Sequence, residues 1–182
     1  MKFFLISLIF SCLFNFKAFS LDTIAKQAIL YDYETKTIIF EKNSEELMSP
    51  SSMSKIMTIY YVFKKIKDGD LKLTDKFKVS KKAWKKGGSK MFVNVNTMVS
   101  VEDLIRGIIV QSGNDACIAI AEGISGSEAL FAEELNLLAE EIGMMDSSFT
   151  NSTGWPDPDH LTTIQDLLTL TVRTIEDFPE LY

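Results

Sequence analysis

The sequence predicts an α+β fold with a little β structure at the front and helices after it. β-Rich runs gather near the start of the chain, and apolar residues at helical spacing fill most of the later part. A length of 182 residues with 46% hydrophobic and 24% charged residues is typical of one globular domain. The net charge is −6, whereas nucleic-acid binding requires a basic face, so we expect no nucleic-acid partner.

Residues 1–20 have the pattern of a secretory signal peptide. Lys2 gives a basic start, residues 3–16 form a nearly unbroken apolar run, and residues 17–20 end in the small-x-small pattern that signal peptidase accepts. The run has about 14 residues, fewer than the roughly 20 that cross a bilayer, which argues against an uncleaved membrane anchor. We therefore expect an exported protein whose folded part is residues 21–182.

The front of this domain is predicted to be a β-hairpin followed by a polar linker. Residues 27–33 and 37–41 are β-rich and flank a turn at 34–36. The linker at 43–54 contains Pro50 and five serines. Two strands alone make a marginal sheet, so we expect further strands to complete it.

Helices are predicted to dominate the rest of the chain. The first is apolar around most of its circumference and should be largely buried. Ser100 is a candidate N-cap with acidic residues after it, and Gly143 is a helix stop. A short strand at 76–79 and a lysine-rich loop with Gly87 and Gly88 follow the first helix. The predicted helices cover 52–67, 100–110, 114–122, 127–142 and a segment from Thr162 or Thr163 toward Glu176.

Cysteine and histidine, which often carry chemistry, receive structural interpretations here. Cys117 is the only cysteine after the signal peptide and lies in an apolar helical stretch, so we expect a buried, inert thiol. His160 is the only histidine, and Asp157 and Asp159 in the same loop are its only obvious orienting acids, so a Ser-His-Asp triad fits poorly. We expect His160 to form local hydrogen bonds. No His/Cys cluster has metal-ligand spacing, and we expect neither a metal nor a cofactor.

Ser52 and Lys55 form the first candidate catalytic pair. Residues three apart share one face of a helix, with Cβ atoms roughly 5–6 Å apart, so the lysine should lie beside the hydroxyl. A serine nucleophile needs a base, and burial beside Ile56, Met57 and Tyr60 would lower the pKa of the lysine so that it can serve. Ser-x-x-Lys also arises by chance, so a capping serine followed by a solvated lysine is the alternative.

Ser112, Gly113 and Asn114 form the second candidate element. This polar tripeptide separates two apolar helices without a proline, which indicates a loop placed for use. Ser112 could shuttle a proton between Lys55 and a leaving amine, and Asn114 could donate to a substrate amide carbonyl while bracing Lys55. A plain turn between helices is the alternative.

Together the two elements resemble the Ser-x-x-Lys and Ser-x-Asn motifs of penicillin-binding proteins and serine β-lactamases. The surrounding residues are similar to the low-molecular-mass, class C D-alanyl-D-alanine carboxypeptidases, serine enzymes of the peptidase S11 kind. The resemblance implies the transpeptidase fold of that group and covers the chain from about residue 25 onward. The segments that carry it are 28–33, 50–58, 88–92, 104–107, 111–116 and 149–157.

The resemblance also implies a reaction. Ser52 would attack the carbonyl between two D-alanines of a peptidoglycan stem peptide, with Lys55 accepting the serine proton. Ser112 would relay a proton to the departing D-alanine, Asn114 with Gly113 would bind the substrate, and water would release the acyl group. β-Lactams would acylate Ser52. The enzyme would work without a cofactor in the periplasm, at the outer face of the cytoplasmic membrane.

One motif of the family has no counterpart in this sequence. The family has Lys-Thr-Gly on a later strand, whereas the one Lys-Thr here, at Lys36, is followed by Ile38. That strand supplies an oxyanion-hole N–H, and losing one such donor costs roughly 10²–10³ in rate. We therefore expect 21–182 to be an incomplete catalytic domain without the C-terminal strands of the sheet, inactive alone. A C-terminal amphipathic anchor, common in the family, would add peripheral membrane association through a segment outside this sequence.

Three other functions stay open from the sequence. A class A-like β-lactamase needs a deacylating glutamate, and Glu133 and Glu134 offer only a superficial match inside a helix, where we expect solvated side chains. A DD-endopeptidase would use the same serine and lysine on cross-linked peptides. A non-catalytic, truncated protein that binds wall peptides is the alternative from a different class, and the absent Lys-Thr-Gly favours it.

Overall fold

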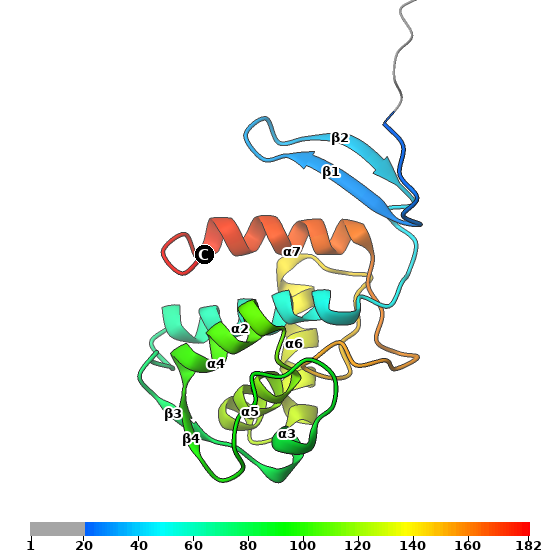
Figure 1. Ribbon diagram of the computed structural model, residues 1–182. Helices are drawn as coiled ribbons and strands as arrows, with labels where there is room; N and C mark the ends of the chain where they lie inside the picture. The colour runs from blue at the N-terminus through cyan, green and yellow to red at the C-terminus, as the bar shows by residue number, and fades with distance from the viewer. Residues whose placement is uncertain (1–20) are drawn as a thin grey trace, which may run out of the picture.

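The structure is a computed structural model that describes residues 21–182, so the predicted signal peptide lies outside the described residues (Figure 1). The order of elements is a hairpin, a helical region that contains a second antiparallel pair of strands, and a final helix. The strands are β1 Ala28–Asp32, β2 Thr37–Lys42, β3 Lys76–Lys78 and β4 Met98–Ser100. The helices are the 3₁₀ turn η1 Ser51–Ser54, α2 Lys55–Lys67, α3 Lys81–Lys85, α4 Val101–Gln111, α5 Asn114–Ser125, α6 Glu128–Ile142 and α7 Ile164–Asp177.

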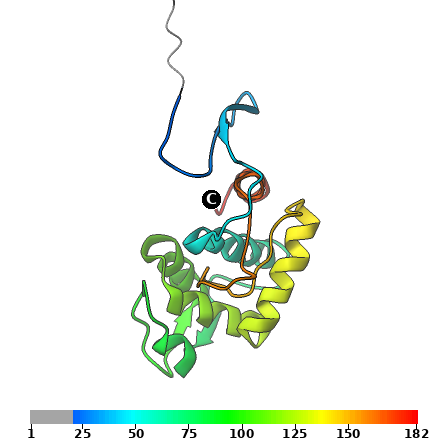
Figure 2. The same cartoon turned by 90° about the vertical axis from the view of Figure 1, so that its right-hand side faces the viewer.

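The predicted front hairpin is confirmed as the antiparallel pair β1–β2. Its register pairs Ala28 with Lys42 and Asp32 with Thr37, with an irregularity after Leu30. The hairpin lies along α7, where Lys36 and Glu176 form an ion pair of 2.6 Å. Figure 2 shows α7 end-on between this hairpin and the other helices. Among residues 21–182 this sheet has two strands, and β3–β4 form a separate antiparallel pair.

The core is built around α2 and α5. Met57 through Phe63 in α2 are all buried, as the apolar circumference of this helix predicts. In α5 the side chains from Asn114 to Ala121 are likewise buried, and α4 and α6 pack against this helix. Cys117 lies in this segment and is a free, fully buried cysteine, as expected.

Helix ends follow the predicted capping residues. The Ser100 side chain accepts a hydrogen bond from the Asp103 amide at the start of α4, and Thr163 does the same for Asp166 at the start of α7. Gly143 ends α6 in a left-handed conformation. None of the helices in the described part of the chain is long and apolar enough to cross a membrane.

The structure contains two elements that the sequence does not predict, the strand β4 and a short helix. The lysine-rich segment predicted as a loop contains the short helix α3. The Ser80 hydroxyl caps it by accepting from the Ala83 amide at 3.0 Å, and Ala83 is fully buried against α5. The prediction failed because one buried residue in five leaves no helical period to detect.

Candidate active site

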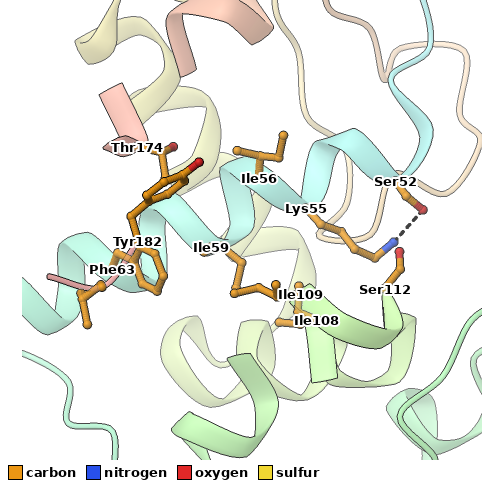
Figure 3. A pocket seen from close by; sticks show the side chains of 11 residues that line it. Ser52, Lys55, Ile56, Ile59, Phe63, Ile108, Ile109, Ser112, Thr174 and Tyr182 are labelled. Atoms are coloured by element: carbon orange, nitrogen blue, oxygen red, sulfur yellow. Dashed lines mark hydrogen bonds between the residues drawn. The ribbon is translucent and has the colours of Figure 1, made fainter. Parts of the chain in front are cut away.

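Ser52 and Lys55 meet as their spacing predicts. Ser52 lies in η1 and Lys55 begins α2, and the Lys55 Nζ is 3.0 Å from the Ser52 Oγ (Figure 3). Ser52 is exposed, whereas Lys55 is only 5% exposed. A capping serine with a solvated lysine is therefore wrong: the serine side chain caps nothing, and the lysine is buried.

The surroundings of Lys55 favour a neutral amine. Burial lowers the pKa of Lys55 below its ordinary value of 10.5, and the neighbouring Cys117 acts in the opposite direction. The second partner of the Nζ is the carbonyl oxygen of Thr153, at 2.8 Å. A neutral amine can keep an N–H on this carbonyl and turn its lone pair to the Ser52 hydroxyl, which is the geometry of a general base.

Ser112 faces the same point from the junction of α4 and α5. It adopts a left-handed conformation with φ 52° and ψ 37°, which ends α4 and turns the chain sharply before α5. Figure 3 shows its hydroxyl beside the Lys55 amine, on the side away from the α2 axis. The tripeptide is thus more than a plain turn, because it brings a second hydroxyl to the Ser52–Lys55 pair.

Asn114 lies at the site but does not brace Lys55. Its Nδ2 donates to the Gly87 carbonyl at 2.9 Å, and its backbone N–H donates to the Ser89 carbonyl at 2.8 Å. No hydrogen bond joins Asn114 to Lys55 within residues 21–182, so the predicted brace is wrong, and the Thr153 carbonyl has that role. The sequence does not predict the contact of Thr153 with Lys55, because 98 residues separate the two.

Two glycines allow backbone segments of the site to pack against each other closely. A Cβ on Gly113 would lie 3.1 Å from the Gly107 carbonyl oxygen and from the Met91 amide nitrogen, so only glycine fits the start of α5 comfortably. A Cβ on Gly154 would overlap the Ser51 carbonyl oxygen, so the loop after Thr153 packs directly on the backbone that precedes Ser52. Gly113 therefore supports Asn114 through the backbone.

Two hollows meet at Ser52. One, of about 260 Å³, lies between residues 88–89 and residues 153–156. The Nζ of Lys86 lies 3.9 Å from the centre of the Trp155 ring, which is part of this lining. The other, of about 330 Å³, is mainly apolar and runs from Lys55 and Ser112 along α2 toward Tyr182 (Figure 3). A peptide could therefore reach the Ser52 hydroxyl from either side.

His160 forms the local hydrogen bonds that the sequence predicts and one distant hydrogen bond that it does not. It is 1% exposed, and its Nε2 lies 2.8 Å from the Oγ of Ser54, 106 residues away, in addition to its local contacts. It does not contact Ser52, so no Ser-His pair forms there. Among residues 21–182 no cluster of histidine, cysteine and acidic side chains could hold a metal ion.

The glutamates of the β-lactamase alternative lie elsewhere. Glu133 is exposed, but Glu134 is half-buried and accepts hydrogen bonds from Tyr61 and Ser125, so the expectation of a solvated side chain is wrong for Glu134. Neither residue lines the two hollows at Ser52. Neither is placed to activate a deacylating water.

Comparisons with known proteins give one family. The family model of D-alanyl-D-alanine carboxypeptidases, peptidase S11, matches residues 15–182. DacF of Bacillus subtilis (strain 168), a D-alanyl-D-alanine carboxypeptidase, is 38% identical over 143 residues, which cover 79% of this chain and 37% of DacF.

Solved structures agree. The D-alanyl-D-alanine carboxypeptidase DacD from Francisella tularensis matches with a TM-score of 0.86 and 40% identity, over 89% of this chain and 39% of that one. Penicillin binding protein 5 from Haemophilus influenzae matches with a TM-score of 0.85 and 36% identity, over 88% and 48% of the two chains. The chain thus spans 37%, 39% and 48% of the lengths of these three proteins.

Proposed function

Because the chain belongs to the D-alanyl-D-alanine carboxypeptidase family, peptidase S11, we propose that it carries the nucleophile of an enzyme that removes the terminal D-alanine from peptidoglycan stem peptides. Its α+β fold is that of the penicillin-binding proteins, in agreement with the fold expected from sequence. One observation carries the proposal: the exposed Ser52 hydroxyl lies 3.0 Å from a buried lysine amine whose pKa is lowered.

In the proposed acylation step, neutral Lys55 removes the Ser52 proton as the serine oxygen attacks the penultimate D-alanine carbonyl. The tetrahedral intermediate collapses when the C–N bond breaks. The departing amine needs a proton, and Lys55 supplies the one that it took from Ser52. The Ser112 hydroxyl, which lies beside the Lys55 amine in Figure 3, passes this proton on. Free D-alanine leaves and the peptide stays as an ester on Ser52. Water, deprotonated by Lys55, then hydrolyses the ester.

Asn114 has the proposed role of substrate positioning. Its Nδ2 bonds the Gly87 carbonyl, which fixes the amide at the edge of the 260 Å³ hollow beside Ser52. The Nδ2 carries a second N–H that can donate to a substrate carbonyl. Gly113 keeps this residue at the helix start, as described above.

The cellular setting is part of the proposal. The pattern of residues 1–20 supports export, with action in the periplasm on the outer face of the cytoplasmic membrane. The likeness to a penicillin binding protein supports β-lactams as covalent inhibitors that acylate Ser52. Peripheral membrane association is proposed from the family resemblance alone, because a C-terminal amphipathic anchor is common in this family.

Covalent labelling tests the proposal. The protein expressed from its whole gene is treated with fluorescent penicillin, digested, and the labelled peptide is identified by mass spectrometry, alongside D-alanine release from a peptide ending in D-Ala-D-Ala. We expect label on Ser52, loss of both signals in Ser52→Ala, and no change in Ser148→Ala, an exposed serine outside the site. Label on another residue, or D-alanine release by Ser52→Ala, would contradict the proposal.

A further inference from the structure

His160 is buried and polar, yet the proposed chemistry does not use it. Three donors surround its Nδ1: the Thr150 amide at 3.2 Å, the Thr150 hydroxyl at 3.2 Å and the Asn151 Nδ2 at 3.3 Å. A backbone N–H can only donate, so Nδ1 accepts and carries no proton. In the neutral ring the proton is then on Nε2, which donates to the Ser54 Oγ at 2.8 Å.

The Ser54 hydroxyl connects His160 to Ser51, the residue before the nucleophile. Because Ser54 accepts from His160, its own proton is free to donate to the Ser51 carbonyl oxygen, at 2.8 Å. Ser51 has a left-handed backbone with φ +48°, a conformation that non-glycine residues adopt only when the surroundings enforce it. The chain Thr150–His160–Ser54–Ser51 therefore runs from a distant loop to the peptide that leads into Ser52.

We propose that His160 is a positioning residue, which through Ser54 holds the Ser51 carbonyl and so fixes the direction of the Ser52 hydroxyl toward Lys55. This inference rests on the proposed role of Ser52 as the nucleophile. His160 acts only when it is neutral, because a proton on Nδ1 would face the Thr150 N–H and break the chain at its first link.

The surroundings keep the ring neutral at pH 7. Burial holds the pKa of His160 below its ordinary value of 6.5, while the Asp157 carboxylate in the same loop acts in the opposite direction. The Phe149 ring, which lies perpendicular to the imidazole, and the neutral groups of Thr150, Asn151 and Ser54 also contact it. On the η1–α2 side the titratable group is Lys55, whose amine turns to Ser52 and Thr153.

Two substitutions separate the halves of the ring. In His160→Gln the amide nitrogen reaches the Nε2 position and can still donate to Ser54, but it cannot titrate. In His160→Asn the shorter amide replaces Nδ1 and does not reach Ser54. Ser54→Ala removes the relay itself. The assay is the rate of acylation by fluorescent penicillin between about pH 5 and pH 8, resolved into reversible binding and the covalent step, on protein expressed from its whole gene.

We expect His160→Gln to acylate within about 3-fold of wild type at pH 7.5 and to lose the part of the acid limb that His160 causes. His160→Asn and Ser54→Ala should slow the covalent step by about 10-fold to 100-fold with little change in reversible binding. Equal rates in all variants, or the same acid limb in wild type and His160→Gln, would overturn the proposal. So would a loss in His160→Asn that His160→Gln shares and that follows melting temperature alone.

A second readout keeps the inference separate from the proposed function. ¹⁵N NMR of the His160 ring should show a proton on Nε2 and none on Nδ1, and hydrogen exchange of the Ser52 to Lys55 amides should speed up in His160→Asn but not in His160→Gln. If wild-type Ser52 takes no penicillin label, the proposed function fails, and these amides alone decide whether His160 orders the turn. Exchange that is identical in both variants would overturn the positioning role.

Discussion

Gly88 offers a test of how closely the site is packed, through the substitution Gly88→Ala. A Cβ there would lie 2.6 Å from the Asn114 Nδ2, about 0.8 Å short of ordinary contact. Asn114 cannot move aside easily, because it is held at two points. Its side-chain Nδ2 donates to the Gly87 carbonyl, and its backbone N–H donates to the Ser89 carbonyl. The amide must therefore move by several tenths of an ångström.

A displacement of this size reaches the chemistry. A misplacement of 1 Å in a positioned group can cost about 10²-fold in rate, so we expect acylation of Ser52 by fluorescent penicillin to slow by about 10-fold to 100-fold in Gly88→Ala. The φ of +78° adds a conformational cost of about 1–2 kcal/mol to the free energy of folding, which is a separate effect on stability.

Gly69→Ala is the matched control for that second effect. Gly69 has a φ of +83° and nothing within 4 Å of a Cβ, so alanine there has a similar backbone cost and meets no neighbour. Acylation rates at pH 7.5 and melting temperatures are measured for both variants. If Gly88→Ala acylates as fast as Gly69→Ala at matched stability, the claim that Gly88 holds the Asn114 amide in place is refuted.

Three further outcomes follow from the same geometry. The acylation rate should rise with pH through the lowered pKa of Lys55 and level off below pH 10.5, because only the neutral amine accepts the Ser52 proton. Lys55→Arg, which stays charged, should abolish labelling at every pH. A flat pH profile of the wild-type rate would refute the role of Lys55 as the base. Burial raises the pKa of the Cys117 thiol to about 12, so iodoacetamide should leave it unmodified in the folded protein and modify it in urea; fast modification of folded protein would contradict its burial. Linear stem peptides should be cleaved at least about 10-fold faster than cross-linked dimers if the carboxypeptidase function holds, whereas preferred cleavage of dimers, followed by mass spectrometry, would favour the endopeptidase alternative.

The sequence predicts those parts of the molecule that depend on neighbouring residues. The hairpin, the buried α2 and the caps at Ser100 and Thr163 all follow from local period or local hydrogen bonding. The contact of Ser52 with Lys55 follows for the same reason, since one helical turn separates them. The short helix α3 and the strand β4 are the exceptions, because each is too brief to show a period.

The groups that sequence analysis missed act across long stretches of chain. Thr153 reaches Lys55 through a backbone carbonyl, which no residue type announces, and Gly154 reads in sequence as an ordinary loop glycine. The sequence predicts only local contacts for His160, because its partner Ser54 is 106 positions away. The sequence shows a histidine in a loop with two prolines, but it does not show that this histidine is buried.

These missed contacts share one source, the loop from Thr150 to His160. Its carbonyl at Thr153 holds the lysine, its glycine at 154 packs on the Ser51 carbonyl, and its histidine orients Ser54. The turn that bears Ser52 starts at a left-handed residue and has no side-chain cap, and the Ser54 hydroxyl that bonds the Ser51 carbonyl is itself oriented by His160. The nucleophile is therefore held in place from outside its own helix. A substitution in this loop should slow acylation without touching either motif, which is why Ser-x-x-Lys alone does not specify a working site.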